Sequence, residues 1–128
     1  MTEKTGGMDP RQVVDVALRA AQEKKGMEIT VMDMQGVTLL CDYFVIISGN
    51  SRPHVRAVAQ GIEDALKDQL GIDEKKIQGR EEGSWILMDY GTVVVHVFLE
   101  NLRSYYDLEG LWDKASIQKA QDTVPASG

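Results

Sequence analysis

Two unbroken apolar runs constrain the fold of this chain more than any other feature. They are Tyr43–Ser48, which reads Tyr-Phe-Val-Ile-Ile-Ser, and Val93–Phe98, which reads Val-Val-Val-His-Val-Phe. Alternate residues of a β-strand point to opposite faces of its sheet, so such runs form strands that are buried on both faces. In the second run one face carries Val93, Val95 and Val97, and the other carries Val94, His96 and Phe98. Neither set is polar, so both faces of the sheet need a cover.

Two amphipathic helices can cover one of these faces. Asp9 is an N-cap and Pro10 a favourable first residue for a helix over residues 10–25, which Gly26 ends in the left-handed conformation. Ser51 caps a second helix over about 52–70, which stops at Gly71. The other face must be covered by the C-terminal segment, by a second copy of the chain or by a partner.

Shorter segments complete the predicted sheet. They are strands at Ile29–Asp33, Trp85–Met88 and Thr92–Phe98, an edge strand near Ile77–Gly79, a hairpin turn at Asp89–Gly91, and helical turns at Asn101–Tyr106 and Leu108–Trp112. The order predicts an α/β (α+β) chain: a single domain over residues 9–112, with a mixed four- to five-stranded sheet and two long helices. Residues 1–8 and 113–128 are predicted to be flexible tails.

Charge and composition narrow the choice of partners. The 128 residues suit one domain, and 14 Lys+Arg against 20 Asp+Glu give a net charge of -6. An acidic surface repels phosphate, so we predict no direct nucleic-acid site and expect a basic protein partner. An apolar run of about 18 residues and an N-terminal apolar signal are both missing, so we predict no membrane contact. The single cysteine, Cys41, indicates a reducing, cytoplasmic location.

Residues for catalysis are sparse. His96 is typical of a hydrogen-bonded structural group in a strand, His54 of a helix cap, and Cys41 of a small core residue, so we predict neither a metal site nor a cofactor. The turn Gly49-Asn50-Ser51 before a helix could hold an anion. A nucleotidyltransferase would also need paired carboxylates for its metal, yet Asp-x-Asp is missing, and Asp107-Leu108-Glu109 falls in a predicted helical turn.

Three sequence blocks resemble the signatures of the ribosomal silencing factor family, also called Iojap or RsfS. They are Asp42–Ile46 with Ser48–Ser51 and His54-Val55; Trp85–Gly91 with Val93–Phe98; and Arg103-Ser-Tyr-Tyr-Asp-Leu-Glu-Gly-Leu-Trp112. The resemblance covers Pro10 to Trp112 with the blocks in order. It implies a nucleotidyltransferase-like fold without catalytic acids, and a protein that is not an enzyme.

The resemblance also implies a function and a binding region. Family members bind ribosomal protein number fourteen of the large ribosomal subunit and block joining to the small subunit, which represses translation, and they are connected with large-subunit assembly. By resemblance the partner-binding residues are Trp85, Met88, Asp89 and Tyr90, with Trp85 as the expected anchor, unless its ring belongs to the core. Two alternatives remain open: a nucleotide-binding or nucleotidyltransferase enzyme that uses Gly49–Ser51, and a homodimeric scaffold.

Overall fold

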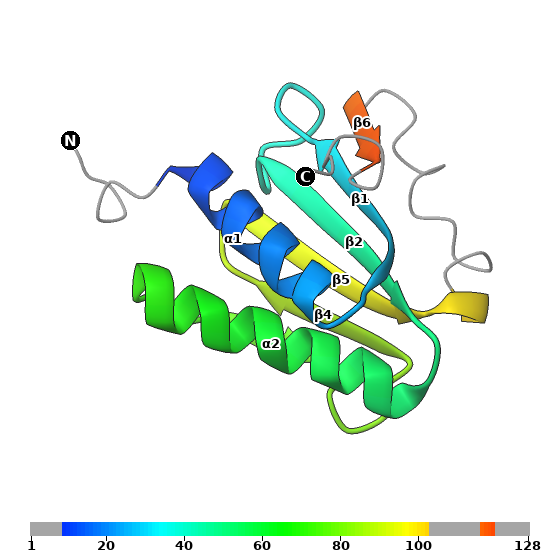
Figure 1. The fold of residues 1–128 in the computed structure, drawn as a ribbon. Helices are drawn as coiled ribbons and strands as arrows, with labels where there is room; N and C mark the ends of the chain where they lie inside the picture. Colours follow the sequence, from blue (N-terminus) through cyan, green and yellow to red (C-terminus); the bar gives the residue numbers. More distant parts are fainter. Residues whose placement is uncertain (1–8, 103–115, 120–128) are drawn as a thin grey trace.

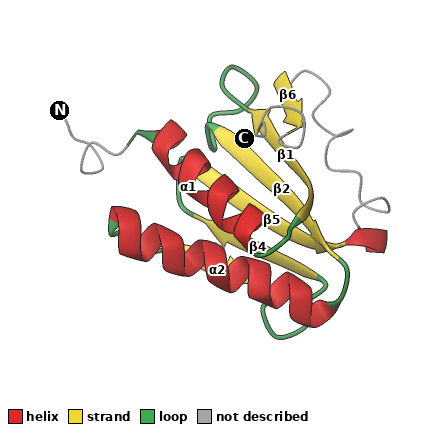
Figure 2. Cartoon of the chain, viewed as in Figure 1, coloured by secondary structure: helices red, strands yellow, loops and turns green. Residues whose placement is uncertain are grey.

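The computed structural model describes residues 9–102 and 116–119, which form one mixed β-sheet with two helices on one face (Figures 1 and 2). The sheet has six strands in the order β3-β4-β5-β2-β1-β6. The elements are α1 (Pro10–Glu23), β1 (Met27–Asp33), β2 (Tyr43–Gly49), α2 (Arg52–Leu70), β3 (Lys76–Gln78), β4 (Trp85–Asp89), β5 (Val93–Leu99) and β6 (Ser116–Lys119). The predicted fold class, a single α+β domain, is confirmed.

The two apolar runs lie where the sequence placed them. β2 and β5 are the central strands and pair in parallel, whereas the pairs β1–β2, β4–β5 and β3–β4 are antiparallel. The parallel pair requires a crossover, which begins with α2 after β2. The predicted hairpin between β4 and β5 is confirmed, and Gly91 at its turn has φ +90°.

Helix α1 begins as predicted but ends differently. The Asp9 side chain accepts a hydrogen bond from the Arg11 amide at 3.0 Å, which caps the helix. The left-handed residue at the other end is Lys25, with φ +62°, and not Gly26. Gly26 is needed for a different reason: a Cβ there would lie 2.7 Å from Cγ2 of Ile47, so the glycine lets the chain pass close to β2.

Helix α2 has the predicted bounds and caps. Ser51 Oγ accepts the His54 amide at 3.2 Å, and Gly71 ends the helix with φ +69°. The His54 ring also joins the two helices. Its Nδ1 accepts the Asn50 amide at 3.0 Å, so Nε2 carries the proton and donates to the Lys24 carbonyl at 2.9 Å.

The main core lies between the helices and the sheet. Its buried side chains include Val14 and Ala17 of α1, Ile62 and Leu66 of α2, and Val95 of β5, all at most 1% exposed. A smaller cluster occupies the opposite face of the sheet and consists of Met32, Met34, Cys41, Ile46 and Phe98. Cys41 is buried there as a free thiol, as predicted.

Strand β6 corrects one prediction. Residues 116–119 were placed in a flexible tail, but they pair antiparallel with β1 from Thr30↔Lys119 to Asp33↔Ser116. Backbone pairing to an edge strand needs no apolar alternation, so the sequence carried no signal for it. The predicted helical segment after β5 begins at Glu100, whereas its continuation and the turn at 108–112 lie outside the described residues.

No helix in the described part of the chain is both long and apolar enough to cross a bilayer.

Candidate functional site

The sheet face opposite the helices carries the candidate site, which we call the open face. Strand register places its side chains in rows across β4, β5 and β2. The rows are Trp85–Phe98–Ser48, Leu87–His96–Ile46 and Asp89–Val94–Phe44. Leu102, in the short helical segment after β5, packs against the cluster on this face. Of the described residues, neither α1 nor α2 lies on this face (Figure 2).

Three aromatic side chains, Trp85, Phe98 and His96, pack together on the open face. The indole stacks on Phe98, with ring centroids 4.7 Å apart, and its Nε1–H donates to Nδ1 of His96 at 3.2 Å. The ring is half-buried, so Trp85 is both attached to the sheet and accessible from outside. Such a rigid, partly exposed aromatic side chain is typical of an interface anchor.

A hollow of about 360 Å³ lies beside this aromatic group on the open face. Its lining consists of Thr38, Leu40, Cys41, Phe44, Lys76, Gln78, Leu87, Asp89, Val94 and His96. Two charged residues of this lining, Lys76 and Asp89, lie directly opposite each other on β3 and β4. Leu40, which lines the hollow from the loop between β1 and β2, is 85% exposed, and its neighbour Leu39 is 104% exposed, so the loop presents two apolar side chains to solvent.

The four predicted partner-binding residues do not share a surface. Trp85 and Asp89 lie on the open face, but Met88 and Tyr90 point the other way and belong to the core under the helices. Met88 is fully buried and Tyr90 is 9% exposed. The reason is the two-residue period of a strand, since residues 85, 87 and 89 share one face. The same period could have identified Leu87, which the sequence reasoning missed.

His96 is buried in this face and uncharged. It is 4% exposed, and burial lowers the pKa of the imidazole to about 4. Since Nδ1 accepts from Trp85, the ring proton is on Nε2, which is shielded from water and has no partner within the described ranges. The prediction of a hydrogen-bonded structural histidine is therefore confirmed for one of its two nitrogens.

Cys41, at the edge of the hollow, is not an activated nucleophile. Burial, together with the smaller effect of the nearby carboxylates of Asp42 and Asp89, raises the pKa of its thiol to about 11. A thiol with this pKa is protonated at neutral pH, whereas the thiolate is the reactive form.

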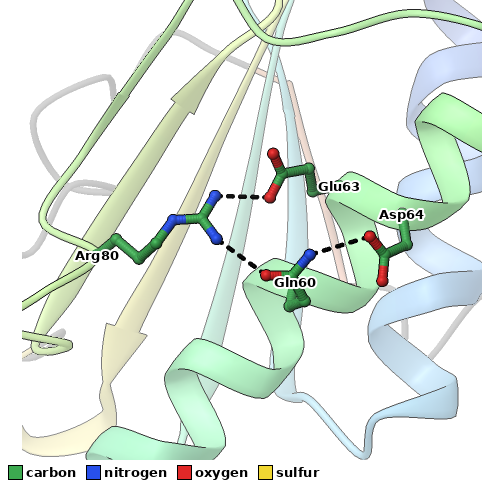
Figure 3. A network of polar contacts seen from close by, with 4 residues as sticks. All are labelled: Gln60, Glu63, Asp64 and Arg80. Carbon is green, nitrogen blue, oxygen red and sulfur yellow. Dashed lines mark hydrogen bonds and ion pairs between the residues drawn. The ribbon is translucent and has the colours of Figure 1, made fainter.

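Helix α2 holds the loop that leads into Trp85. Arg80 donates to Glu63 Oε1 at 2.6 Å and to Gln60 Oε1 at 2.9 Å, as Figure 3 shows. Arg56 donates to the carbonyls of Arg80 and Glu81 at 3.1 and 2.7 Å. These contacts tie the segment before β4 to the helix layer.

Gly79, in the same loop, is required by geometry. Its φ is +85°, and a Cβ there would overlap the carbonyl oxygen of Trp85. The glycine and the two arginines together determine where Trp85 enters the sheet.

At the alternative anion site around Gly49–Ser51, three amides donate within the chain. The Asn50 amide donates to the His54 ring, the His54 amide to Ser51 Oγ, and the Val55 amide to the Ser51 carbonyl at 2.9 Å. Among the residues that the structure describes, no group of three or more His, Cys, Asp or Glu could hold a metal ion.

The fold and this face together define a single α+β domain with a helix layer on one side of a mixed sheet and an aromatic, apolar face on the other. Residues 8–127 match the family model described as "Ribosomal silencing factor during starvation". The chain is similar to the ribosomal silencing factor RsfS of Bacillus subtilis (strain 168), with 43% identity over 86% of this chain and 92% of the relative.

Two further comparisons agree with this match. A crystal structure from Chromobacterium violaceum, 36% identical, superimposes with a TM-score of 0.80 over 83% of this chain and 88% of that one. A more distant relative from Mus musculus, named mitochondrial assembly of ribosomal large subunit protein 1, is 29% identical over 88% of this chain and 52% of its own length. This chain belongs to the ribosomal silencing factor family, and the resemblance in its three sequence blocks is confirmed.

Proposed function

We propose that this protein binds the large ribosomal subunit in the cytoplasm through ribosomal protein number fourteen, and thereby blocks joining of the small subunit and represses translation. Family membership supports the ribosomal role, and the name of the mouse relative supports the large subunit. The observation that carries the proposal is the open face, with Trp85 presented beside an apolar hollow.

The physical character of the open face suits a protein partner. The exposed side chains of Leu39 and Leu40 lose unfavourable contact with water when a partner covers them. Ribosomal proteins are mostly basic, so the net charge of -6 favours encounter with such a partner. Steric exclusion of the small subunit needs no catalytic group, which is why we propose a binding protein and not an enzyme.

Sucrose-gradient sedimentation tests the proposal. The protein is mixed with purified large subunits, and small subunits are then added at a magnesium concentration that normally permits joining. We expect the protein to migrate with the large subunit and the amount of joined ribosomes to fall. A protein that stays at the top of the gradient while joining proceeds would contradict the proposal.

Trp85→Ala tests whether the open face makes the contact. We expect binding to weaken by about 2 kcal/mol or more, because a central tryptophan often dominates an interface. Gln69→Ala is the matched control, since Gln69 is exposed on α2 in the helix layer. Melting temperatures of both variants show whether the Trp85 change acts through stability. Unchanged affinity with a lowered melting temperature would mean that Trp85 is a core residue.

Asp89→Asn tests the role of charge at the rim of the hollow. The amide still offers an oxygen to the Gly91 amide, which the Asp89 carboxylate accepts at 2.8 Å, so the turn is preserved. We expect a slower association rate and an unchanged dissociation rate, because charge acts mainly on encounter. Raising the salt concentration should slow association of the unmodified protein in the same way. The opposite pattern would argue against charge steering.

The two alternative functions predict different measurements. A homodimeric scaffold would cover the same open face with a second copy, and light scattering on the purified protein would then give the mass of a dimer. A nucleotide-binding enzyme would give a calorimetric isotherm with nucleoside triphosphate and magnesium. We expect no isotherm, since the Asn50 and His54 amides at this turn already donate within the chain.

A further inference from the structure

His96, one of the residues that line the hollow on the open face, holds a buried hydrogen-bond donor without a partner in the described part of the chain. His96 stands between Trp85 and the hollow: its Nδ1 faces the indole, and the ring contributes to the lining. Nε2 carries the proton and has no acceptor among the described residues. Buried donors in folded proteins are nearly always paired, so an orphaned one calls for an acceptor from elsewhere.

The surroundings of His96 restrict what that acceptor can be. Leu87 and Ile46, the register partners of His96, are apolar, and so are Val94 and Phe44 of the adjacent row. Leu40 adds an exposed apolar side chain. The hollow is lined by one cationic side chain, Lys76, which lies opposite the carboxylate of Asp89. The hollow therefore has no excess positive charge, and His96 is neutral, so an occupant with a full negative charge would gain little electrostatic attraction. A neutral acceptor that carries an apolar group fits this lining.

We propose that the hollow receives a backbone carbonyl, together with an adjoining apolar side chain, from the ribosomal protein partner, and that Nε2–H of His96 donates to this carbonyl. The inference rests on the proposed function and deepens it, because it names the group that the partner brings to the open face. The hollow of about 360 Å³ is continuous with that face, since Leu87 and Asp89 line it.

Two neighbours of His96 have defined parts in this contact. The bond from Trp85 holds the imidazole in the tautomer that has its proton on Nε2. Because Nε2 is shielded from water, the occupant reaches it only when a neighbouring side chain moves. The Phe44 ring stands edge-on to the imidazole with centroids 4.8 Å apart, and we expect this ring to move when the occupant enters. Trp85 thus positions the donor as well as offering its own surface.

The test combines a variant with a direct observation of the imidazole. His96→Leu removes the donor and keeps an apolar side chain; its affinity for purified large subunits is compared with that of the unmodified protein. We expect binding about tenfold weaker, the size of one lost hydrogen bond to a buried group. Nitrogen-15 NMR of the imidazoles, with and without isolated ribosomal protein number fourteen, then follows Nε2–H. We expect this proton to shift downfield on binding.

The second histidine is an internal control for the NMR experiment. His54 has the same tautomer, but both of its nitrogens are already bonded, to the Asn50 amide and the Lys24 carbonyl. We expect its signals to stay unchanged when the partner is added. Equal shifts at both rings would indicate a general change of structure and overturn the assignment of the acceptor to the hollow.

The outcomes separate this inference from the proposed function. If the unmodified protein binds large subunits but His96→Leu binds equally well, the hollow is not an acceptor site and the proposed function stands. Weaker binding by the variant without any shift of Nε2–H would mean that leucine acted by repacking, and would also overturn the inference. If the unmodified protein does not bind large subunits at all, both proposals fail.

Discussion

Protonation of His96 makes the stability of this fold depend on pH, which gives a quantitative test of the structure. Burial lowers the pKa of the imidazole from 6.5 to about 4. The unfolded chain therefore binds a proton near the higher value and the folded chain near the lower one. Between these two values the unfolded state holds more protons, so the free energy of unfolding falls as the pH is lowered.

The size of the effect follows from the two pKa values. One unit of pKa difference corresponds to about 1.4 kcal/mol. At about pH 5 the loss of stability relative to neutral pH is about 2 kcal/mol, and it approaches about 3 kcal/mol near pH 4 and below. Because His96 is only 4% exposed, solvent does little to reduce this penalty. The penalty is absent above about pH 6.5, grows as the pH falls from about 6.5 to about 4, and is complete below about 4.

Urea unfolding of the protein and of His96→Leu at neutral pH and near pH 5 measures the effect. The 20 acidic residues are common to both chains, so the difference between their pH dependences isolates the imidazole. We expect the unmodified protein to lose about 2 kcal/mol more than the variant over this interval. An equal loss in both chains would refute the conclusion that His96 is buried and neutral.

Three further predictions concern Gly79, Cys41 and the exposed pair Leu39 and Leu40. Gly79→Ala should lower the free energy of unfolding by about 2 kcal/mol or more, because strain at φ +85° adds to the overlap with the Trp85 carbonyl. Gly71→Ala, at φ +69° in open space, should lower it by only about 1 kcal/mol. Urea unfolding of the two variants measures the difference. Cys41 should react with iodoacetamide far more slowly in the folded than in the unfolded protein, and equal rates would contradict a thiol pKa of about 11. The double change Leu39→Ser with Leu40→Ser should leave the melting temperature within about 1 °C of the unmodified protein, because both side chains are exposed. It should weaken large-subunit binding in the gradient assay. A large drop in melting temperature would contradict the exposure of these side chains.

Local signals predicted the elements well, because caps act within a few residues of where they stand. Ser51 and Gly71 defined both ends of α2, and their side-chain and backbone geometry is as expected. The predicted end of α1 was wrong, because the helix stops at Glu23 and Gly26 does not adopt the left-handed conformation. The structure shows that Gly26 is needed for space, through its approach to Ile47, and that Lys25 takes the left-handed conformation.

The site was predicted only in part, because a sequence block does not state which way each side chain points. Trp85 and Asp89 lie on the open face, but Met88 and Tyr90 lie in the main core, since alternate residues of β4 face opposite sides. The hollow itself is built from segments far apart in the chain, among them Leu40, Lys76 and Val94. Pairing of β3 with β4 and of β5 with β2 brings these segments together.

The sequence by itself determined what acts at short range. The apolar runs specified two central strands, the capping residues specified two helices, and the three sequence blocks identified the family. Tertiary structure alone decided the pairing of β6 with β1, the hydrogen bond from Trp85 to His96, and the burial that keeps that histidine neutral. These features depend on distances between residues that are remote in the chain. Only the packing of the sheet sets those distances, and it places Trp85 and His96 together on the open face.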